Sequence, residues 1–153
     1  MDRVRQVHVF DFSPGTYMHL DPSAFVADPE LVTALQKQAA PIECAADRVL
    51  FRQGESATGL YILENGEVTL TMDSLAGESI LSIETAAGSL LGLPALAGGQ
   101  PYSLTAVARS GAKVSFVARD KFTAFMQSYP TLAFKILQVL AAEVSAARRA
   151  ISI

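Results

Sequence analysis

Short runs rich in β-branched and aromatic residues, separated by turn residues, fill the chain from residue 42 to 117. Seven or eight such runs at this spacing predict a β-sandwich or barrel. The clearest turn signal is the Asn65-Gly66 dipeptide, which favours a type I′ turn. The residues on either side of it, Tyr61–Leu63 and Val68–Leu70, are therefore predicted to pair as a hairpin.

The residues before this β-rich part predict a helix and less regular segments. Asp28 is a candidate N-cap, and the apolar spacing after it predicts a helix over about 29–39, closed by Pro41. Residues 4–12 have the composition of a strand lying outside the main body. Residues 13–25 contain two prolines and a glycine and indicate an irregular connector.

Strand character ends at Val117, and two helices are predicted to follow. Asp120 is the candidate N-cap of the first, and Pro130 is its predicted stop. In the second, apolar residues recur at alternating steps of three and four, as in a short coiled-coil seam: Leu137, Leu140, Val144, Ala147 and Ile151. This seam has two interpretations, a dimer interface or packing on the chain's own β-rich body.

Charge and hydropathy exclude several classes of partner. The net charge is −3, and the basic pairs Arg3/Arg5 and Arg148/Arg149 lie at opposite ends of the chain. Because nucleic-acid binders concentrate basic residues on one surface, we expect no direct binding of DNA or RNA. No apolar run approaches the roughly 20 residues of a membrane span, and the N-terminus lacks a signal-peptide core. A cytoplasmic location without membrane attachment is expected.

Few residues are suited to metal or catalytic chemistry. Cys44 is the single cysteine, which excludes an internal disulfide, and we expect it to be a small buried apolar residue. The two histidines, His8 and His19, both precede the predicted barrel, so no histidine pair lies on its strands. The sequence contains no nucleophile elbow or phosphate-binding P-loop. The chain is therefore expected to be no enzyme and to hold neither metal nor cofactor.

Two segments resemble the cyclic nucleotide-binding domain superfamily, in particular the sensor domains of CRP–FNR transcription regulators. They are RVLFRQGESATGLYILENGEVTL and GSLLGLPALAGGQPYSLTAVA, and the resemblance runs from about Asp47 to Ala150. In the second segment several residues fall where the family's phosphate-binding cassette has its glycines, its Ala-Leu pair and its proline: Gly88, Gly92, Ala95, Leu96 and Pro101.

The resemblance implies a mainly β fold, a double-stranded β-helix jelly roll flanked by helices, in which the last helix forms a dimer. A homodimer is therefore expected. The implied organisation has an N-terminal extension and helix (1–40), a cyclic nucleotide-binding-like β-roll (41–118), and C-terminal helices that include the dimer helix (119–153).

The cassette departs from the family at the residues that bind the nucleotide. The resemblance implies a glutamate for the ribose 2′-hydroxyl and an arginine for the cyclic phosphate, and these positions hold Leu93 and Tyr102. A buried phosphate without a paired cation is strongly disfavoured, so binding of cyclic AMP or cyclic GMP is not expected. The purine-holding hydroxyl residues of the last helix are replaced as well, by Ala146, Ala147 and Arg148. A glycine of the first strand turn is replaced by Asp47.

Two interpretations of the altered cassette remain open. In one, an apolar or neutral small molecule binds there, in a cavity facing the strands from Tyr61 to Leu70. The candidate ligand-binding residues are then Leu91, Gly92, Leu93, Ala95, Leu96, Tyr102, Ser103 and Thr105. In the other, Leu93 and Tyr102 fill the former pocket and close the core.

The predicted function is accordingly a non-catalytic sensor or regulatory domain, and the alternative is a ligand-free dimeric scaffolding module. The family usually continues into a helix-turn-helix domain, whereas this sequence ends at Ile153. Either the DNA-reading domain is lacking, or a longer natural chain has been truncated.

Overall fold

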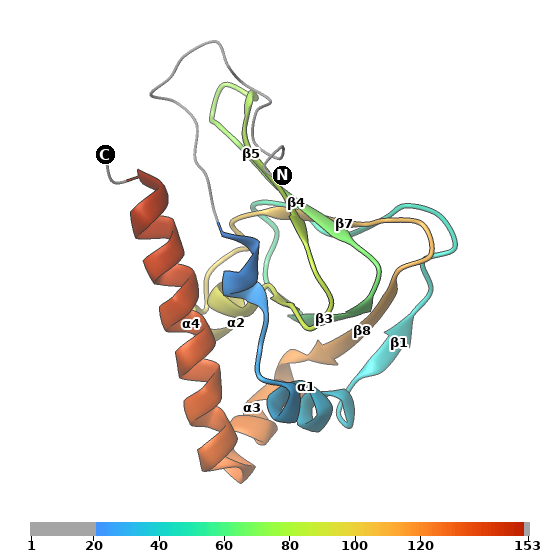
Figure 1. The fold of residues 1–153 in the computed structure, drawn as a ribbon, viewed down its shortest axis with the longest axis vertical. Coiled ribbons are helices and arrows are strands. Elements are labelled where there is room, and N and C mark those ends of the chain that lie inside the picture. The colour runs from blue at the N-terminus through green and yellow to red at the C-terminus, as the bar shows by residue number, and fades with distance from the viewer. Residues whose placement is uncertain (1–20, 152–153) are drawn as a thin grey trace.

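Eight antiparallel strands form two four-stranded sheets in the computed structural model, which describes residues 21–151 (Figure 1). In the first sheet the order is β1 (Ala40–Ile42), β8 (Lys113–Ala118), β3 (Gly59–Asn65) and β6 (Leu90–Leu91). In the second it is β2 (Arg48–Phe51), β7 (Thr105–Ala108), β4 (Val68–Asp73) and β5 (Ser79–Thr85). The predicted jelly roll with flanking helices is confirmed.

The predicted hairpin between Tyr61–Leu63 and Val68–Leu70 is wrong. The strand β3 pairs with β6 and β8, whereas β4 pairs with β5 and β7, so the two predicted partners lie in different sheets. The Asn65-Gly66 turn does exist, and Gly66 has a φ of +91°. It carries the chain from one sheet to the other, because both strands bury apolar residues between the sheets and gain more from partners distant in sequence.

Two clusters of buried side chains divide the interior. The first lies between the sheets and contains Phe51, Tyr61, Leu63, Leu70, Ile83, Leu91, Tyr102 and Val114 among others. The second lies between the first sheet and the helices, with Leu31, Leu35, Leu60, Ile62, Leu90, Leu93, Phe122 and Ile136 among its members. Alternate residues of β3 enter different clusters, as the two-residue period of a strand requires.

The N-terminal helical segments cover one edge of the roll. A short 3-10 helix, η2 (Pro22–Phe25), lies within the predicted connector, and α1 (Pro29–Gln36) follows it. Asp28 caps α1 as predicted, because its Oδ2 accepts hydrogen bonds from the backbone N–H groups of Glu30 and Leu31 at 3.0 and 3.3 Å. The helix ends at Gln36, earlier than predicted. The strand predicted over 4–12 lies outside the described residues.

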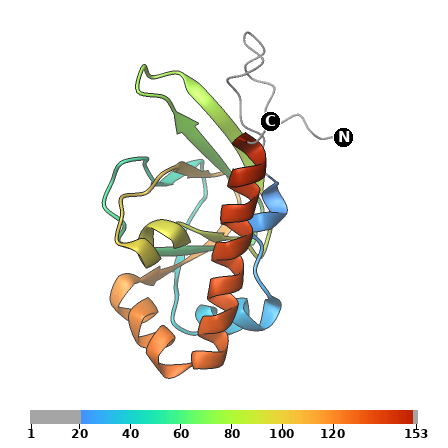
Figure 2. The same ribbon diagram turned by 90° about the vertical axis from the view of Figure 1, so that its left-hand side faces the viewer.

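Three further helices lie after β6: α2 (Leu93–Gly98), α3 (Arg119–Ser128) and α4 (Pro130–Ile151). The N-cap of α3 is Ala118 rather than the predicted Asp120, which lies in the first turn and accepts a hydrogen bond from the N–H of Lys121. Figure 2 shows α4 running along one side of the roll, with η2 beside it.

The inward face of α4 differs from the predicted seam. Ile136, Val139 and Ala146 are buried, whereas Leu137 and Val144 are each 55% exposed. Of the predicted seam, Leu140 alone packs against the second cluster; Ala147 is exposed, and the side chain of Ile151 lies outside the described part of the chain.

By length and composition, α4 is apolar enough over Pro130–Arg149 to cross a membrane. This contrasts with the expectation from the sequence that no apolar run comes near such a length. In the structure part of that apolar character is accounted for by the face that packs on the roll.

Candidate functional site

The cassette consists of β6, the short helix α2 and the loop that leads to β7. Its tight entry depends on Gly92, which has a φ of +87° and stands at the N-terminus of α2. A Cβ added at Gly92 would lie 2.8 Å from Cε1 of Tyr102, so the absence of a side chain lets the tyrosine ring lie against the backbone.

Tyr102 occupies the centre of the cassette and is only 3% exposed. Its hydroxyl donates to the carbonyl oxygen of Gly59 at 2.7 Å and accepts from the N–H groups of Thr58 and Gly59, each at 3.2 Å. Its ring stacks on Phe51 with a centroid distance of 4.0 Å and an interplanar angle of 18°. The hydroxyl therefore already has one acceptor and two donors within the protein, and it holds the cassette loop against β3.

A small hollow remains beside Tyr102, facing β2, β4 and α4. Its volume is about 40 Å³, which is room for a few water molecules at most. The residues that line it are Phe25, Phe51, Leu70, Leu91, Gly92, Pro94, Ala95, Tyr102, Ser103, Leu104 and Glu143. No lysine or arginine is among these residues, within the described part of the chain.

A larger groove of about 350 Å³ continues from this hollow between η2, the cassette, β4 and α4. The hollow and the groove share Phe25, Pro94, Ser103, Leu104 and Glu143. The remaining lining of the groove is apolar, from Ala24, Met72, Val144, Ala146 and Ala147. A mostly apolar groove with few polar groups has the composition of a small-molecule site, and its volume lies at the lower end of the usual range.

Glu143 is the one acidic side chain among the described residues that line the groove. Its Oε2 is buried and has no hydrogen-bond partner within residues 21–151. Burial disfavours the charged form and raises the pKa of this carboxyl to about 8. Near neutral pH the groove therefore carries a mostly protonated carboxylic acid.

The predicted ligand-binding residues separate into two groups in the structure. Leu91, Gly92, Ala95, Tyr102 and Ser103 line the hollow beside the cassette. The others lie elsewhere. Leu93 and Leu96 point into the second buried cluster. The Oγ1 of Thr105 accepts a hydrogen bond of 2.9 Å from the N–H of Gln53.

Sequence reasoning missed the contributions of α4 and η2 to this region. It reached Ala146, Ala147 and Arg148 by counting from the helix break, and Glu143 lies one turn earlier on the same face as Ala146. The available signal was the spacing of Ile136, Val139, Glu143 and Ala146, in which a glutamate interrupts an otherwise apolar face. Nothing in the sequence placed Phe25 or Met72 beside the cassette.

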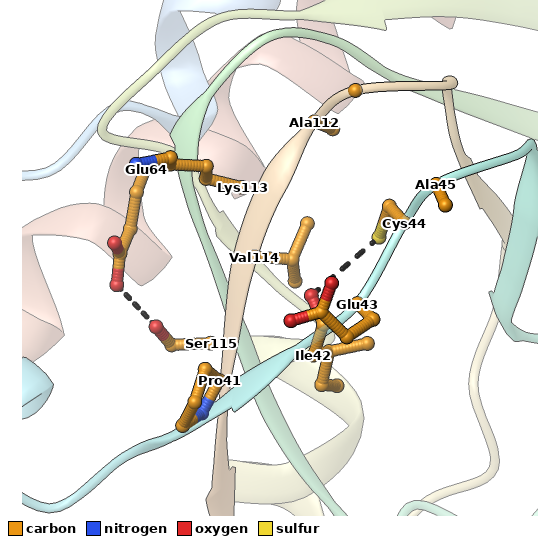
Figure 3. A pocket seen from close by; sticks show the side chains of 11 residues that line it. Pro41, Ile42, Glu43, Cys44, Ala45, Glu64, Ala112, Lys113, Val114 and Ser115 are labelled. Atoms are coloured by element: carbon orange, nitrogen blue, oxygen red, sulfur yellow. Dashed lines mark hydrogen bonds between the residues drawn. The ribbon is translucent and has the colours of Figure 1, made fainter.

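A separate hollow of about 450 Å³ lies beside β1 and β8 (Figure 3). Its polar groups are occupied: Glu64 accepts a hydrogen bond from the hydroxyl of Ser115, and the thiol of Cys44 lies 3.8 Å from the carbonyl oxygen of Ile42. Burial raises the pKa of the Cys44 thiol, so little of the reactive thiolate forms near neutral pH. We therefore assign these residues a structural role.

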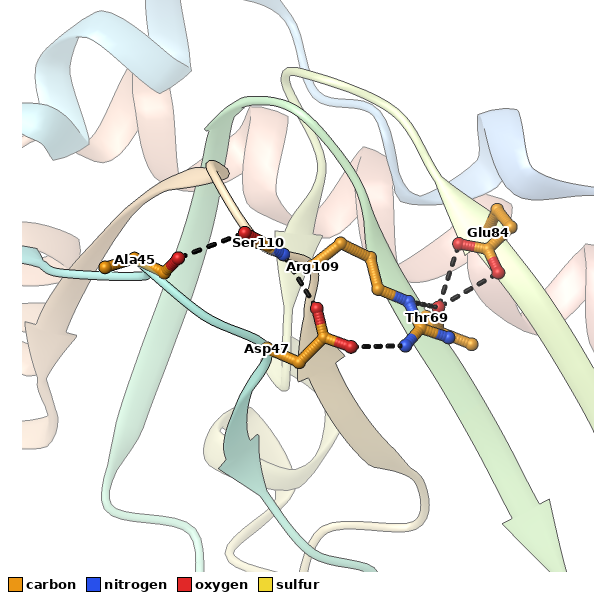
Figure 4. A network of polar contacts seen from close by, with 6 residues as sticks. All are labelled: Ala45, Asp47, Thr69, Glu84, Arg109 and Ser110. Atoms are coloured by element: carbon orange, nitrogen blue, oxygen red, sulfur yellow. Dashed lines mark hydrogen bonds and ion pairs between the residues drawn. The ribbon is translucent and has the colours of Figure 1, made fainter.

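A polar network links the strands of the second sheet (Figure 4). Asp47 accepts from Nη1 of Arg109 at 3.1 Å and from the N–H of Ser110 at 2.8 Å. Nε of Arg109 donates to Oγ1 of Thr69 at 2.8 Å, and that hydroxyl contacts Glu84 at 2.9 Å. Arg109 is thus held by groups outside the hollow and the groove, and it belongs to the sheet rather than to the cassette.

Among residues 21–151, no three histidine, cysteine, aspartate or glutamate side chains are grouped as metal ligands. The predicted surface or packing histidines, His8 and His19, lie outside the described residues.

A two-sheet roll with a glycine-bounded cassette and a long C-terminal helix defines a class, the small-molecule sensor domains of transcription regulators. The comparison with family models assigns the particular family. Residues 41–129 match the model of the cyclic nucleotide-binding domain, and the chain belongs to this family.

Solved structures with the same fold are bacterial regulators. The catabolite activator protein of Thermus thermophilus has a TM-score of 0.69 at 22% identity, over 82% of this chain and 59% of that chain. The N-terminal domain of a transcriptional regulator from Streptomyces coelicolor gives 0.62 at 21%, over 86% and 92%. The c-di-GMP-responsive global regulator of Xanthomonas campestris gives 0.69 at 15%, over 82% and 61%.

At such identities the similarity shows the fold. The chain spans less than two thirds of the Thermus regulator's length. No curated protein sequence matches it significantly.

Proposed function

We propose that the chain is a non-catalytic sensor domain that does not bind cyclic AMP or cyclic GMP. Its ligand is instead a small apolar molecule without negative charge, bound in the groove between the cassette and α4. Membership of the cyclic nucleotide-binding domain family supports a sensing or regulatory role.

The observation that carries this proposal is the position of Tyr102. It fills the centre of the cassette, and its hydroxyl is bound to Gly59 and Thr58. A cyclic phosphate placed there would have no lysine or arginine among the described lining residues. Burying an unpaired anion costs several kcal/mol, which the neutral hydroxyl does not offset.

The groove supports the choice of an apolar ligand. It offers about 350 Å³, against about 40 Å³ in the hollow beside Tyr102. The Glu143 carboxyl adds a second argument against nucleotides, because a phosphate beside it would raise the cost of ionising either group.

The proposal is tested by screening a small-metabolite panel for ligands that raise the melting temperature. Ala147→Phe places a ring in the groove, and Ala142→Phe places the same ring on an exposed position of α4 outside the groove lining. We expect a ligand whose binding is lost in Ala147→Phe and retained in Ala142→Phe. A panel without any stabilising compound, or a ligand indifferent to Ala147→Phe, would favour the alternative function of a ligand-free scaffold.

We also propose that the chain forms a homodimer through α4. Phe134, Leu137 and Val144 are 61%, 55% and 55% exposed, and their spacing places them on one face of the helix. Exposed apolar residues aligned in this way commonly mark an interface. Light scattering should give a dimer for the native chain and a monomer for Leu137→Glu, with Gln138→Glu as the control. A native monomer at about ten micromolar would contradict this interface.

The remaining partners follow from the charge and from the family. The described surface offers no basic stripe, so this polypeptide is proposed to make no direct contact with nucleic acid. A cytoplasmic location without membrane attachment fits a relative of bacterial regulators.

A further inference from the structure

The groove contains one feature that its apolar character does not explain. Glu143 extends from α4 between η2 and the cassette, and Figure 1 shows these three elements meeting on the same side of the roll. Its Oε2 is buried without a hydrogen-bond partner among the described residues. Nearly all buried polar atoms in proteins have partners, so an orphaned carboxyl oxygen at a groove calls for one.

The surroundings of Glu143 restrict what that partner is. The elements η2 and α2 contribute no titratable side chain to the groove, and Asp73 of β4 is exposed and outside the lining. Tyr102 is the other titratable residue that lines the adjoining hollow, and its hydroxyl is bound to backbone groups. The described chain thus supplies neither a cation nor a donor to Oε2, and an incoming molecule would supply both.

We propose that Glu143 is the specificity-determining residue of this groove and that the ligand is a small apolar amine. Its ammonium group donates a hydrogen bond to Oε2 of Glu143, and its hydrocarbon body lies against the apolar lining. This inference rests on the proposed function, since it names the chemical class of ligand for the same groove.

The choice of an amine follows from charge balance. A neutral alcohol satisfies Oε2 with one hydrogen bond but leaves no charge compensation, and a carboxylic acid brings a second negative group. An ammonium both donates hydrogen bonds and neutralises the carboxylate, and charge-assisted hydrogen bonds are the stronger kind. The volume of about 350 Å³ accommodates one aromatic ring with a short side chain.

Binding of this kind moves a proton. Without ligand Glu143 is mostly protonated at neutral pH, since burial raises its pKa to about 8. The amine enters as an ammonium ion, so the carboxyl must release its proton to the buffer when the ion pair forms. Amine affinity should therefore increase from about pH 6 to about pH 8, and a neutral ligand should show no such increase.

The experiment compares three probes with the same ring and chain length: 2-phenylethylamine, 2-phenylethanol and phenylacetate. Binding to the full 153-residue chain is measured by calorimetry at pH 7 in two buffers with different ionisation enthalpies. We expect the amine to bind at least about tenfold more tightly than either of the others. We also expect nearly one proton to be released for each amine bound.

A pair of matched variants completes the test. Glu143→Gln keeps the size of the side chain and removes its charge, and it should weaken amine binding at least about tenfold and abolish proton release. Glu67→Gln makes the same change on an exposed turn and should alter neither. The probe series and the proton count use the native chain, so they stand even if a variant folds poorly.

Three results would overturn the inference. They are equal or tighter binding of 2-phenylethanol or phenylacetate, unchanged amine affinity in Glu143→Gln, and no detectable amine binding at millimolar concentration. If another compound of the metabolite panel binds the groove and is lost in Ala147→Phe, the proposed function stands without the amine. If no compound of the panel binds, the proposed function fails as well.

Discussion

The buried Glu143 carboxyl makes the stability of the domain depend on pH in a defined direction. Its pKa is about 8 in the folded chain against an ordinary value of 4.5. Between these values the folded chain holds a proton that the unfolded chain has released. The free energy of unfolding therefore decreases as pH rises through this range and levels off above about pH 8.

The magnitude follows from the two pKa values. One pH unit between them is worth about 1.4 kcal/mol, so a fully dry site would lose about 5 kcal/mol in total. Because the glutamate side chain is only partly enclosed, solvent screening reduces this, and we expect a loss of about 2 kcal/mol. Replacing Glu143 with leucine removes the titrating group, so Glu143→Leu should exceed the native chain in stability by about this amount at high pH.

The assay is urea unfolding followed by circular dichroism from about pH 5 to about pH 9, applied to the native chain and Glu143→Leu. The difference between the two curves isolates this carboxyl from the other titrating groups. Glu67→Leu, an exposed control, should follow the native pH dependence. Parallel curves for the native chain and Glu143→Leu would refute the reasoning, because they would show that the carboxyl titrates normally.

Two further substitutions test the packing around the cassette. Tyr102→Phe removes the hydroxyl that bonds Gly59 and should cost about 2 kcal/mol, a fall of about 4–8 °C in the melting temperature; an unchanged melting temperature would contradict this role. Gly59→Ala would place a Cβ against the ring of Phe116 and the carbonyl oxygen of Val117, so it should yield little folded protein. Gly98→Ala, whose Cβ would have its nearest neighbour at 3.9 Å, should fold normally, and equal solubility of the two alanine variants would count against the predicted clash.

The sequence predicted the fold well because its strongest signals are local. The strand-rich runs and the helix cap at Asp28 are each determined by neighbouring residues, and the structure confirms them. Strand pairing is a different matter, since it depends on contacts between residues far apart in the chain. The Asn65-Gly66 turn was recognised, but nothing nearby showed that β3 and β4 belong to different sheets.

The candidate site was predictable only in its cassette half. The replacement of a cation by Tyr102 is visible in the sequence, whereas the hydroxyl's bonds to Gly59 depend on how β3 lies beside the cassette loop. The groove depends on which face of α4 turns inward. Apolar residues occur on two faces of this helix, one with Ile136 and Ala146 and one with Leu137 and Val144, and heptad spacing alone does not rank them.

The account depends most on the claim that the cassette no longer accommodates a cyclic phosphate. Calorimetric titration of the native chain with cyclic AMP and with cyclic GMP tests it directly. We predict no binding heat at nucleotide concentrations up to about 1 mM, because Tyr102 fills the cassette and no cation replaces the arginine. A micromolar dissociation constant for either nucleotide would contradict the account.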